Sequence, residues 1–279
     1  MSYNLKDGSY TTGGYNQSVN DRKVGLAKTI ALKNPEIVCL QESNDLSAST
    51  LASSCASNGT RTYSVYQQHH TAVMWDPALF TKLANGSVDC TVPEGEGGDG
   101  YTRICTWVKL KRNADDEIFY VVSAHFDLNT PGTSATTLIN YIDDHFEGMP
   151  TIIAGDLNAN EARWVNIAQF KNAGYTNANT AYTDFLTNQN IKGYGSYQWT
   201  DMVGNTTAAD NGLAVTFPKN GNILDWCYYT TSAINSGSYE VVSSTVTWSV
   251  SNSATLYMTK SVTDNPSDHY PIYLKFSFQ

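Results

Sequence analysis

The apolar positions along the chain fall mostly into short runs, which is the pattern of β-strands. Continuous runs, typical of buried strands, occupy residues 36–40, 71–75, 117–124, 151–154 and 223–229. Further strands are predicted at 102–111, 240–248, 255–261 and 272–278. The last of these alternates strictly and places Ile272, Leu274, Phe276 and Phe278 on one face. Strands therefore dominate the predicted secondary structure.

Helices are predicted between some of these strands, at 21–33, 133–146 and 161–173, and the polar segment 47–62 is interpreted as a helix with a loop. In the first helix, Val24, Ala27, Ile30 and Ala31 share one face, and Asn34-Pro35 ends it. The second turns Leu138, Ile139, Ile142 and Phe146 inward. No repeat or interdomain linker interrupts this order. The pattern predicts one domain of residues 1–279, an α/β sandwich of two packed sheets with outer helices.

Two segments show little regular pattern. Residues 93–100 form an acidic, glycine-rich loop, which is interpreted as a solvated insertion. Residues 175–221 are low in charge and rich in Gly, Asn, Thr and aromatic residues, which is typical of long loops that face a substrate. Their aromatic part, at 193–217, would suit a sugar or a headgroup.

Composition narrows the class of protein. The 279 residues are 41% hydrophobic and 15% charged, so the chain has ample core material, and no apolar run is long enough to span a bilayer. The formal net charge of −9 argues against a broad basic groove that tracks a polyanion. A phosphate substrate remains compatible with this charge, because a bound divalent cation inverts the local potential.

The chain has five cysteines. Cys39 and Cys227 lie in apolar, strand-like runs and are predicted to be buried thiols. Cys55, Cys90 and Cys105 lie in or near loop-like segments, where one disulfide is possible. The chain carries Asn-x-Ser/Thr sequons and does not start with a signal peptide. We expect a secreted, cell-surface or periplasmic protein whose leader is absent from this chain, with the cytoplasm as the alternative.

Residues 151–159 contain the first candidate residues of a functional site. Asp156 and Asn158 follow a strand-like apolar run and alternate onto the same side of the chain. A carboxylate binds a divalent cation or accepts a proton, and a carboxamide bonds a substrate oxygen without adding charge. A plain turn after a core strand is the alternative, since Gly, Asp and Asn are ordinary turn residues.

Polar side chains also stand at the ends of other predicted strands. The full set is Asn4, Glu42, His125, Asp156, Asn158, Asp225, Asp268 and His269. Each has a simpler explanation when taken alone: Glu42 could cap a helix, and His125 could be a hydrogen-bonded core imidazole. Together they supply the carboxylates, amides and imidazoles that metal-assisted phosphoester hydrolysis requires.

These motifs resemble those of the endonuclease/exonuclease/phosphatase superfamily, which includes deoxyribonuclease I, abasic-site endonucleases, neutral sphingomyelinases and inositol-polyphosphate phosphatases. The matching segments are 1–4, 35–42, 123–127, the Gly-Asp-x-Asn motif at 155–159, 225–226 and Ser-Asp-His at 267–269. The resemblance covers nearly the whole chain. It implies a four-layered α/β sandwich, in which two packed, mainly antiparallel sheets are flanked by helices.

The resemblance also implies a metal site and a place for the attacking water. Glu42 would be the main ligand of Mg²⁺, with Mn²⁺ and Ca²⁺ as alternative ions, and Asn4 and Asp268 would lie close to the metal. Asp156 would position or deprotonate the water, and Asn158 would hold a phosphate oxygen.

Three further residues would contact the phosphate under this resemblance. His269 would act with Asp225, either as a general base or as an imidazolium on the phosphate. His125 would be a second imidazole at the scissile phosphate or the leaving group. Arg103 would bind phosphate.

The expected function is divalent-metal-dependent hydrolysis of a phosphoester by a monomeric enzyme, with phosphodiesters favoured over monoesters. A nuclease is one candidate, because the deoxyribonuclease I-like branch carries a second histidine where His125 stands. A hydrolase of lipid headgroups or inositol phosphates, similar to sphingomyelinases, is the alternative, although the chain has no clear basic cluster for several phosphates. A catalytically inactive binding module is the third hypothesis, and the intact set of polar residues argues against it.

Overall fold

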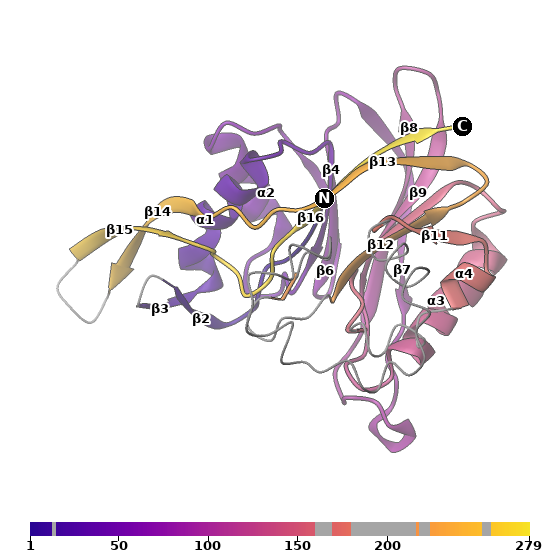
Figure 1. Ribbon diagram of the computed structural model, residues 1–279, viewed down its shortest axis with the longest axis horizontal. Helices are drawn as coiled ribbons and strands as arrows, with labels where there is room; N and C mark the ends of the chain where they lie inside the picture. Colours follow the sequence, from indigo (N-terminus) through magenta and orange to yellow (C-terminus); the bar gives the residue numbers. More distant parts are fainter. Residues whose placement is uncertain (13–14, 160–168, 180–215, 218–223, 253–257) are drawn as a thin grey trace, which may run out of the picture.

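The chain folds around two six-stranded β-sheets (Figure 1). The structure is a computed structural model, which describes residues 1–12, 15–159, 169–179, 216–217, 224–252 and 258–279. The first sheet has the order β13 (Ile234–Val241), β16 (Ile272–Phe278), β1 (Ser2–Asn4), β4 (Ile37–Gln41), β6 (Thr71–Trp75) and β5 (Ser64–Gln68). The second has the order β11 (Tyr175–Asn177), β12 (Asp225–Thr230), β10 (Thr151–Asp156), β9 (Ile118–His125), β8 (Ile104–Arg112) and β7 (Phe80–Asp89).

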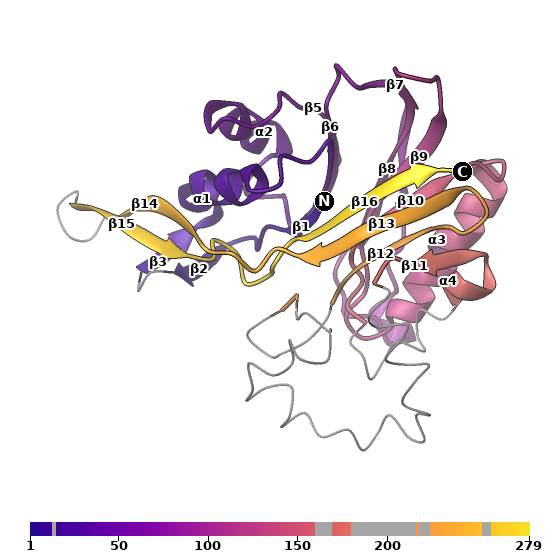
Figure 2. The same cartoon turned by 45° about the horizontal axis from the view of Figure 1, so that its top comes forward.

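Each sheet contains one parallel pair at its centre, β1 with β4 and β10 with β9, and every other neighbour in the two sheets is antiparallel. Helices α1 (Val19–Ala31) and α2 (Ala48–Ser57) lie on the outer side of the first sheet, and α3 (Pro131–His145) and α4 (Gln169–Asn172) lie on the outer side of the second (Figure 2). The predicted sandwich of two mainly antiparallel sheets between helices is confirmed.

Three apolar cores hold these layers together. One lies between the sheets and contains Val73, Val121, Ile152 and Ile272. The second lies under α1 and α2, and the third lies under α3, where Leu138, Ile139, Ile142 and Phe146 are buried as predicted. Leu274, Phe276 and Phe278 pack against the central core, as the alternation of the last strand predicted. No helix in the described part of the chain is long and apolar enough to cross a bilayer.

Two smaller hairpins lie beside α1, away from the second sheet (Figure 1). They are β2 (Ser9–Thr12) with β3 (Tyr15–Ser18), and β14 (Val246–Asn252) with β15 (Met258–Asp264). The prediction of one strand at 240–248 is wrong, since β13 ends at Val241 and β14 begins at Val246. Val242 and Val246 are both buried, and the exposed residues 243–245 between them form the connection.

Other boundaries moved by a few residues. Helix α1 begins two residues before its predicted start, because Ser18 and Asp21 form a capping box at its N-terminus. Of the predicted helix at 161–173, residues 160–168 lie outside the described residues, and α4 represents the rest. Most of the predicted substrate-facing region at 193–217 also lies outside the described residues.

The sequence predicts Cys55, Cys90 and Cys105 in or near loop-like segments. Cys55 lies in α2 and Cys105 in β8, while Cys90 directly follows β7. All five cysteines of the chain are buried, and the structure holds them as thiols. The helix of the predicted helix with a loop at 47–62 is thus α2, and Cys55 lies in its last turn.

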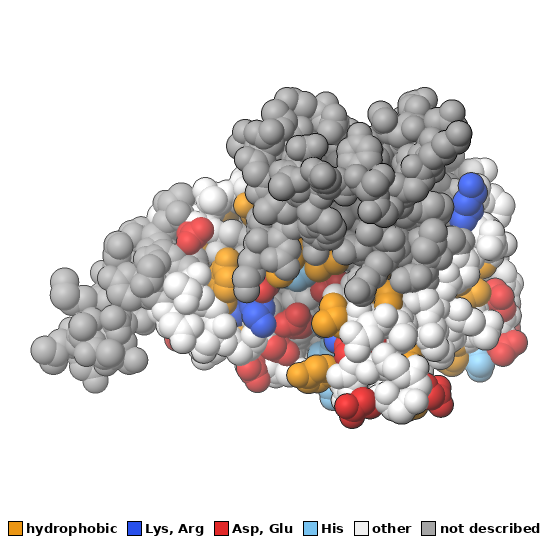
Figure 3. Space-filling view, turned by 60° about the horizontal axis from the view of Figure 1, so that its bottom comes forward, with side chains coloured by type: hydrophobic (Ala, Val, Ile, Leu, Met, Phe, Trp, Pro, Cys, Tyr) orange, Lys and Arg blue, Asp and Glu red, His pale blue; other side chains and the backbone are white. Residues whose placement is uncertain are grey.

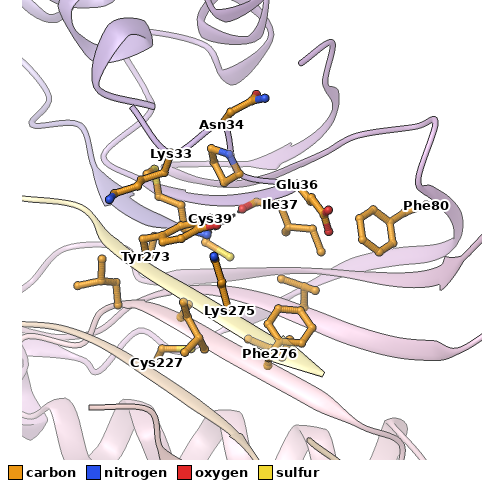
Figure 4. A pocket seen from close by; sticks show the side chains of 18 of the residues that line it. Lys33, Asn34, Glu36, Ile37, Cys39, Phe80, Cys227, Tyr273, Lys275 and Phe276 are labelled. Atoms are coloured by element: carbon orange, nitrogen blue, oxygen red, sulfur yellow. Dashed lines mark hydrogen bonds between the residues drawn. The ribbon is translucent and has the colours of Figure 1, made fainter. Parts of the chain in front are cut away.

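A cavity of about 470 Å³ lies between the two sheets (Figure 4). Apolar residues of both sheets line it, among them Ile37, Cys39, Cys227 and Phe276, and charged side chains such as Lys275 border it. Its lining contains no residue of the predicted site. The cavity and the polar strand ends are therefore separate features of the described structure.

The close contact between β9 and β10 requires glycine at position 155. A Cβ atom added to Gly155 would lie 1.8 Å from the carbonyl oxygen of Ala124. We expect Gly155→Ala to lower the free energy of unfolding by about 3 kcal/mol, because backbone and not a movable side chain blocks the methyl group. Urea unfolding measures this change. Gly95→Ala is the control, since no atom lies within 4 Å of its added Cβ, and equal stability of the two variants would contradict the prediction.

Candidate active site

Strands of both sheets bring the predicted polar residues to one end of the sandwich. Asn4 ends β1, His125 ends β9, Asp156 ends β10 and Asp225 begins β12. In the second sheet, Asp156 pairs with His125 on one side and with Asp225 on the other. These four side chains are buried. Acidic side chains gather at this end of the molecule, with histidine side chains among them (Figure 3).

The carboxylate of Asp156 is the centre of the site. Its Oδ2 accepts a hydrogen bond from Nδ2 of Asn4 at 2.9 Å, and the same amide nitrogen donates to Oε1 of Glu42 at 3.0 Å. Two imidazoles approach the same oxygen: Nε2 of His269 at 3.7 Å and Nε2 of His125 at 3.8 Å. Residues separated by more than a hundred positions in sequence thus meet at one oxygen atom.

His269 is held by Asp225. Its Nδ1 lies 2.8 Å from Oδ2 of Asp225, and because a carboxylate only accepts, Nδ1 carries the proton. Burial lowers the pKa of His269, but the negative charges of Asp225, Asp156 and Asp268 overcome that effect and raise it to about 10. The His269 side chain is therefore an imidazolium at neutral pH, with Nε2 directed toward Asp156.

The environment of Asp156 makes its carboxyl a weaker acid than usual. Burial raises the pKa of its carboxyl to about 7, and the nearby Asp225 and Glu42 charges add to this, while the His269 charge partly offsets it. An aspartate with a raised pKa is a stronger base than an exposed one. Its position and its basicity both suit the removal of a proton from water.

Glu42 and Asn158 stand in an unusual backbone conformation. Their φ angles are 53° and 50°, in the left-handed region that non-glycine residues seldom adopt. Such strain is stored at functional sites at a cost of about 1–3 kcal/mol. Asn158 donates from Nδ2 to the carbonyl oxygen of Phe126 at 2.8 Å, which leaves its second amide hydrogen for a substrate oxygen.

The donor set fits a divalent cation. Glu42, His125 and Asp156 each present one ligand atom, and these atoms all lie within 4.8 Å of one another. Asp268 is half-buried, and its Oδ1 has no hydrogen-bond partner among the described residues. Burial raises the pKa of Asp268, and Glu42 is among the charges that raise it further. Like charges with an unpartnered oxygen are the environment that a bound cation stabilises. Asn4 lies between Glu42 and Asp156 and holds both carboxylates.

Arg103 lies against the second imidazole. Its Nη1 is 2.8 Å from Nε2 of His125, and its Nε and Nη2 donate to Oδ2 of Asp99. Since a guanidinium only donates, Nε2 of His125 accepts and its proton sits on Nδ1. Burial, the Arg103 charge and neighbouring imidazoles hold the pKa of His125 well below its usual range. His125 is therefore neutral, in contrast to His269.

Asp99 also corrects the interpretation of residues 93–100 as a solvated insertion. The outer part of this loop is exposed, and it contains the 3₁₀ helix η1 (Glu94–Glu96). The Asp99 carboxylate, however, is 5% exposed and pairs with Arg103. It also accepts from the backbone N–H of Leu128 at 3.0 Å. The loop therefore contributes to the site through its last residues.

Two buried residues near the site were not predicted. Arg22 of α1 donates to the carbonyl oxygens of Leu5 and Pro266 and so joins the two chain segments that carry Asn4 and Asp268. His70, before β6, packs edge-on against His125, with 4.9 Å between the ring centres. Arg22 occupies a polar position of an amphipathic helix, which gives no signal of burial. His70 lies in a short turn between two strands, where a polar residue is expected.

His70 predicts a pH dependence of stability. Burial, followed by the charge of Arg103, lowers its pKa to about 3. The unfolded imidazole has an ordinary pKa near 6.5, so the unfolded state binds a proton that the native state does not. Stability therefore falls as the pH drops from about 6.5 toward 3, by up to about 1.4 kcal/mol per pH unit for this one group.

We expect His70→Gln to make the stability of the protein less dependent on pH in this window. The measurement is urea unfolding of the wild type and the variant at several pH values. His145→Gln is the control, because His145 is exposed on α3. Identical pH slopes for the wild type and His70→Gln would show that His70 titrates normally in the native protein.

Comparison with known proteins identifies the family. The sequence model of the endonuclease/exonuclease/phosphatase family matches residues 1–269, nearly the whole chain. The chain belongs to this family. It is thus a phosphoester hydrolase by family, as the motifs at its strand ends predicted. No curated protein matches the sequence.

Solved structures of the family share the fold. The mannosyl-6-phosphatase of Bacteroides thetaiotaomicron is 16% identical, with a TM-score of 0.65 over 99% of this chain and 98% of that one. The human Nocturnin catalytic domain, with a bound sulfate anion, is 16% identical, with a TM-score of 0.60 over 93% and 87%. D. rerio TDP2, complexed with a single-strand DNA product, is 15% identical, with a TM-score of 0.54 over 92% of each chain. These likenesses establish the fold that the chain shares with them.

Proposed function

We propose that the protein is a divalent-metal-dependent phosphodiesterase that acts on nucleic acid. The observation that carries the proposal is the placement of Asp156, a carboxyl with a raised pKa, within 3.7 Å of an imidazolium and beside the carboxylate of Glu42. Phosphoester hydrolysis needs a base for water and positive charge for the phosphate, and this arrangement offers both.

Glu42 and Asp268 would hold the cation, with Asp156 and His125 beside it. A bound Mg²⁺, Mn²⁺ or Ca²⁺ ion supplies neutralisation of the non-bridging phosphate oxygens. Asn4 fixes the spacing of two carboxylates by donating to both of them. This division of roles leaves the proton chemistry to the other residues of the site.

Asp156 accepts the proton of the attacking water. His269 donates a charged hydrogen bond from Nε2 to a phosphate oxygen, and Asp225 keeps it protonated and oriented. The second amide hydrogen of Asn158 bonds another phosphate oxygen. His125 would lie beside the phosphate, since its Nε2 faces Asp156 at 3.8 Å and accepts from Arg103.

Phosphodiesters are favoured because His125 adds a second imidazole to the site. In addition, TDP2, a structure of the same fold, is described with a DNA product. Phosphomonoesters of sugars or headgroups are the second candidate. The net charge of −9 favours this class, since no excess of cations steers a polyanion to the protein, and a mannosyl-6-phosphatase has the same fold.

A panel of substrates with and without Mg²⁺ tests the proposal. It contains plasmid DNA, RNA, sphingomyelin, inositol phosphates, mannose 6-phosphate and bis-p-nitrophenyl phosphate, and the Asp156→Ala/His269→Ala double variant is the blank. We expect Mg²⁺-dependent nicking of the plasmid above the blank. Turnover of a monoester or headgroup alone would replace the nuclease with the second candidate. Activity that neither EDTA nor the double variant removes would refute the catalytic assignment.

A further inference from the structure

Two cysteines meet at the base of the loop that carries Asp99. Cys105 of β8 pairs with Val88 of β7, and Cys90 lies two residues after Val88. The backbone N–H of Cys90 donates to the carbonyl oxygen of Arg103 at 2.7 Å, so the two segments continue side by side beyond the ladder. Residues 88 and 90 of one strand and 105 of the other then share one face.

The two side chains are enclosed together. Cys90 is 1% exposed and Cys105 is 0% exposed, and both belong to the apolar core under α3. The two thiols lie close enough to interact, since the Cys105 side chain is the largest influence that raises the pKa of Cys90. Cys90 lies diagonally opposite Cys105, at positions whose Cα atoms are typically about 7–8 Å apart. A disulfide spans about 4.4–6.8 Å, so the two strands approach each other slightly when the bond forms.

We propose that Cys90 and Cys105 form a disulfide that closes the loop of residues 91–104. Each thiol loses a proton, and the pair gives two electrons to a small disulfide such as oxidised glutathione, which leaves as two thiols. No other redox partner is needed. The product is one S–S bond across the β7–β8 pair.

The bond forms while the chain folds. In the folded protein, the hydrogen bond from the neighbouring thiol and burial raise the pKa of Cys90 well above its usual value, so little thiolate is present. Thiol–disulfide exchange requires the thiolate and access to solvent. An unfolded or partly folded chain in an oxidising compartment provides both, and folding then buries the bond.

The other pair of neighbouring cysteines does not qualify. Cys39 and Cys227 lie in different sheets, and both line the cavity between them. Packed sheets are about 10 Å apart, which exceeds the Cα separation that a disulfide spans. Cys39 also lies 3.8 Å from the carbonyl oxygen of Val122 through its Sγ, as a buried thiol does.

The disulfide would fix the part of the loop that supports the site. Arg103 donates from its backbone N–H to Oγ1 of Thr91 at 2.9 Å, and Oγ of Ser134 donates to the carbonyl oxygen of Cys90 at 2.9 Å. The same loop carries Asp99, which holds the Arg103 guanidinium against His125. Closure at 90 and 105 therefore restricts the segment that positions Arg103.

The test uses the full chain, refolded with reduced and oxidised glutathione and then unfolded in denaturant with iodoacetamide. We expect three of the five cysteines to be alkylated, since two are linked. Trypsin cuts after Arg103, between the two cysteines, so the linked peptides are 83–103 and 104–109, each with a single cysteine. Their joint mass, lost on reduction, identifies the bond. Five alkylated cysteines, or a bond to any other cysteine, would overturn the proposal.

Thermal unfolding gives a second readout. Reductant should lower the midpoint by about 5–10 °C, because the loop then regains its freedom in the unfolded state. The Cys90→Ala/Cys105→Ala variant should not respond to reductant, whereas the control Cys55→Ala should respond as the wild type does. A wild-type midpoint that reductant leaves unchanged would count against the bond. Neither readout uses activity, so both test the disulfide independently of the proposed function.

Discussion

Replacement of Asp225 by asparagine should lower kcat/KM for bis-p-nitrophenyl phosphate by about 10³–10⁴-fold. The carboxamide of the variant keeps the size of the side chain but removes the charge that faces Nδ1 of His269 at 2.8 Å. The pKa of His269 then falls, because burial still lowers it and the charge of Asp225 no longer raises it. The imidazolium that the phosphate requires is lost at neutral pH, and the orientation of the ring is no longer fixed.

Asp143→Asn is the matched control, because Asp143 is an exposed carboxylate on α3. Circular dichroism and thermal unfolding verify that Asp225→Asn is folded. A second readout separates the electrostatic role from a structural one: the pH optimum of Asp225→Asn should lie below that of the wild type, since the weaker imidazole base is protonated only at lower pH, while Asp156 must still be deprotonated. A folded Asp225→Asn variant with less than a tenfold loss would refute the role assigned to the pair.

The second large effect is expected at Glu42. Glu42→Gln retains an oxygen that accepts from Nδ2 of Asn4, but it loses the acceptor of the Asp7 backbone N–H and removes one negative charge from the cluster with Asp156 and Asp268. We expect the Mg²⁺ concentration for half-maximal activity to rise more than about 100-fold, beyond what the loss of an outer-shell partner costs. Titration calorimetry of Mg²⁺ in the absence of substrate should show the same loss of affinity.

Glu36→Gln is the control for this change. Glu36 lies on the exposed surface before β4, only six residues from Glu42, and its charge faces Arg61 at 3.9 Å. The control should bind Mg²⁺ and turn over substrate as the wild type does. An unaltered Mg²⁺ requirement in Glu42→Gln would show that Glu42 is not a ligand of the metal.

Several features of the site were visible in the sequence for a physical reason. Buried strands must be apolar, so a polar residue such as Asp156 at the end of such a run stands out. The last residues of the parallel strands β9 and β10 and the first residue of the antiparallel β12 lie at the same edge of the second sheet, so His125, Asp156 and Asp225 meet there. The alternation of the last strand likewise indicated which side chains pack against the central core.

Other features depend on contacts that a local pattern does not encode. Asp99 belongs to a loop whose composition is that of an exposed segment, and only the partner Arg103 makes it part of the site. Arg22 is buried because backbone carbonyls far apart in sequence surround it. Beyond the end of β13, the backbone N–H of Val242 still donates to the carbonyl oxygen of Pro271, a contact between distant segments.

The first sheet mixes the two ends of the chain, since β16 lies directly beside β1. The hydroxyl of Ser267 donates to the carbonyl oxygen of Asn4 at 2.8 Å, across almost the entire sequence. During synthesis, the catalytic centre therefore cannot assemble until the last strand has left the ribosome. Contacts of such high sequence separation also make folding slow. Regain of activity during refolding should accordingly be one of the last signals to appear, which makes the catalytic assay a reporter of complete folding.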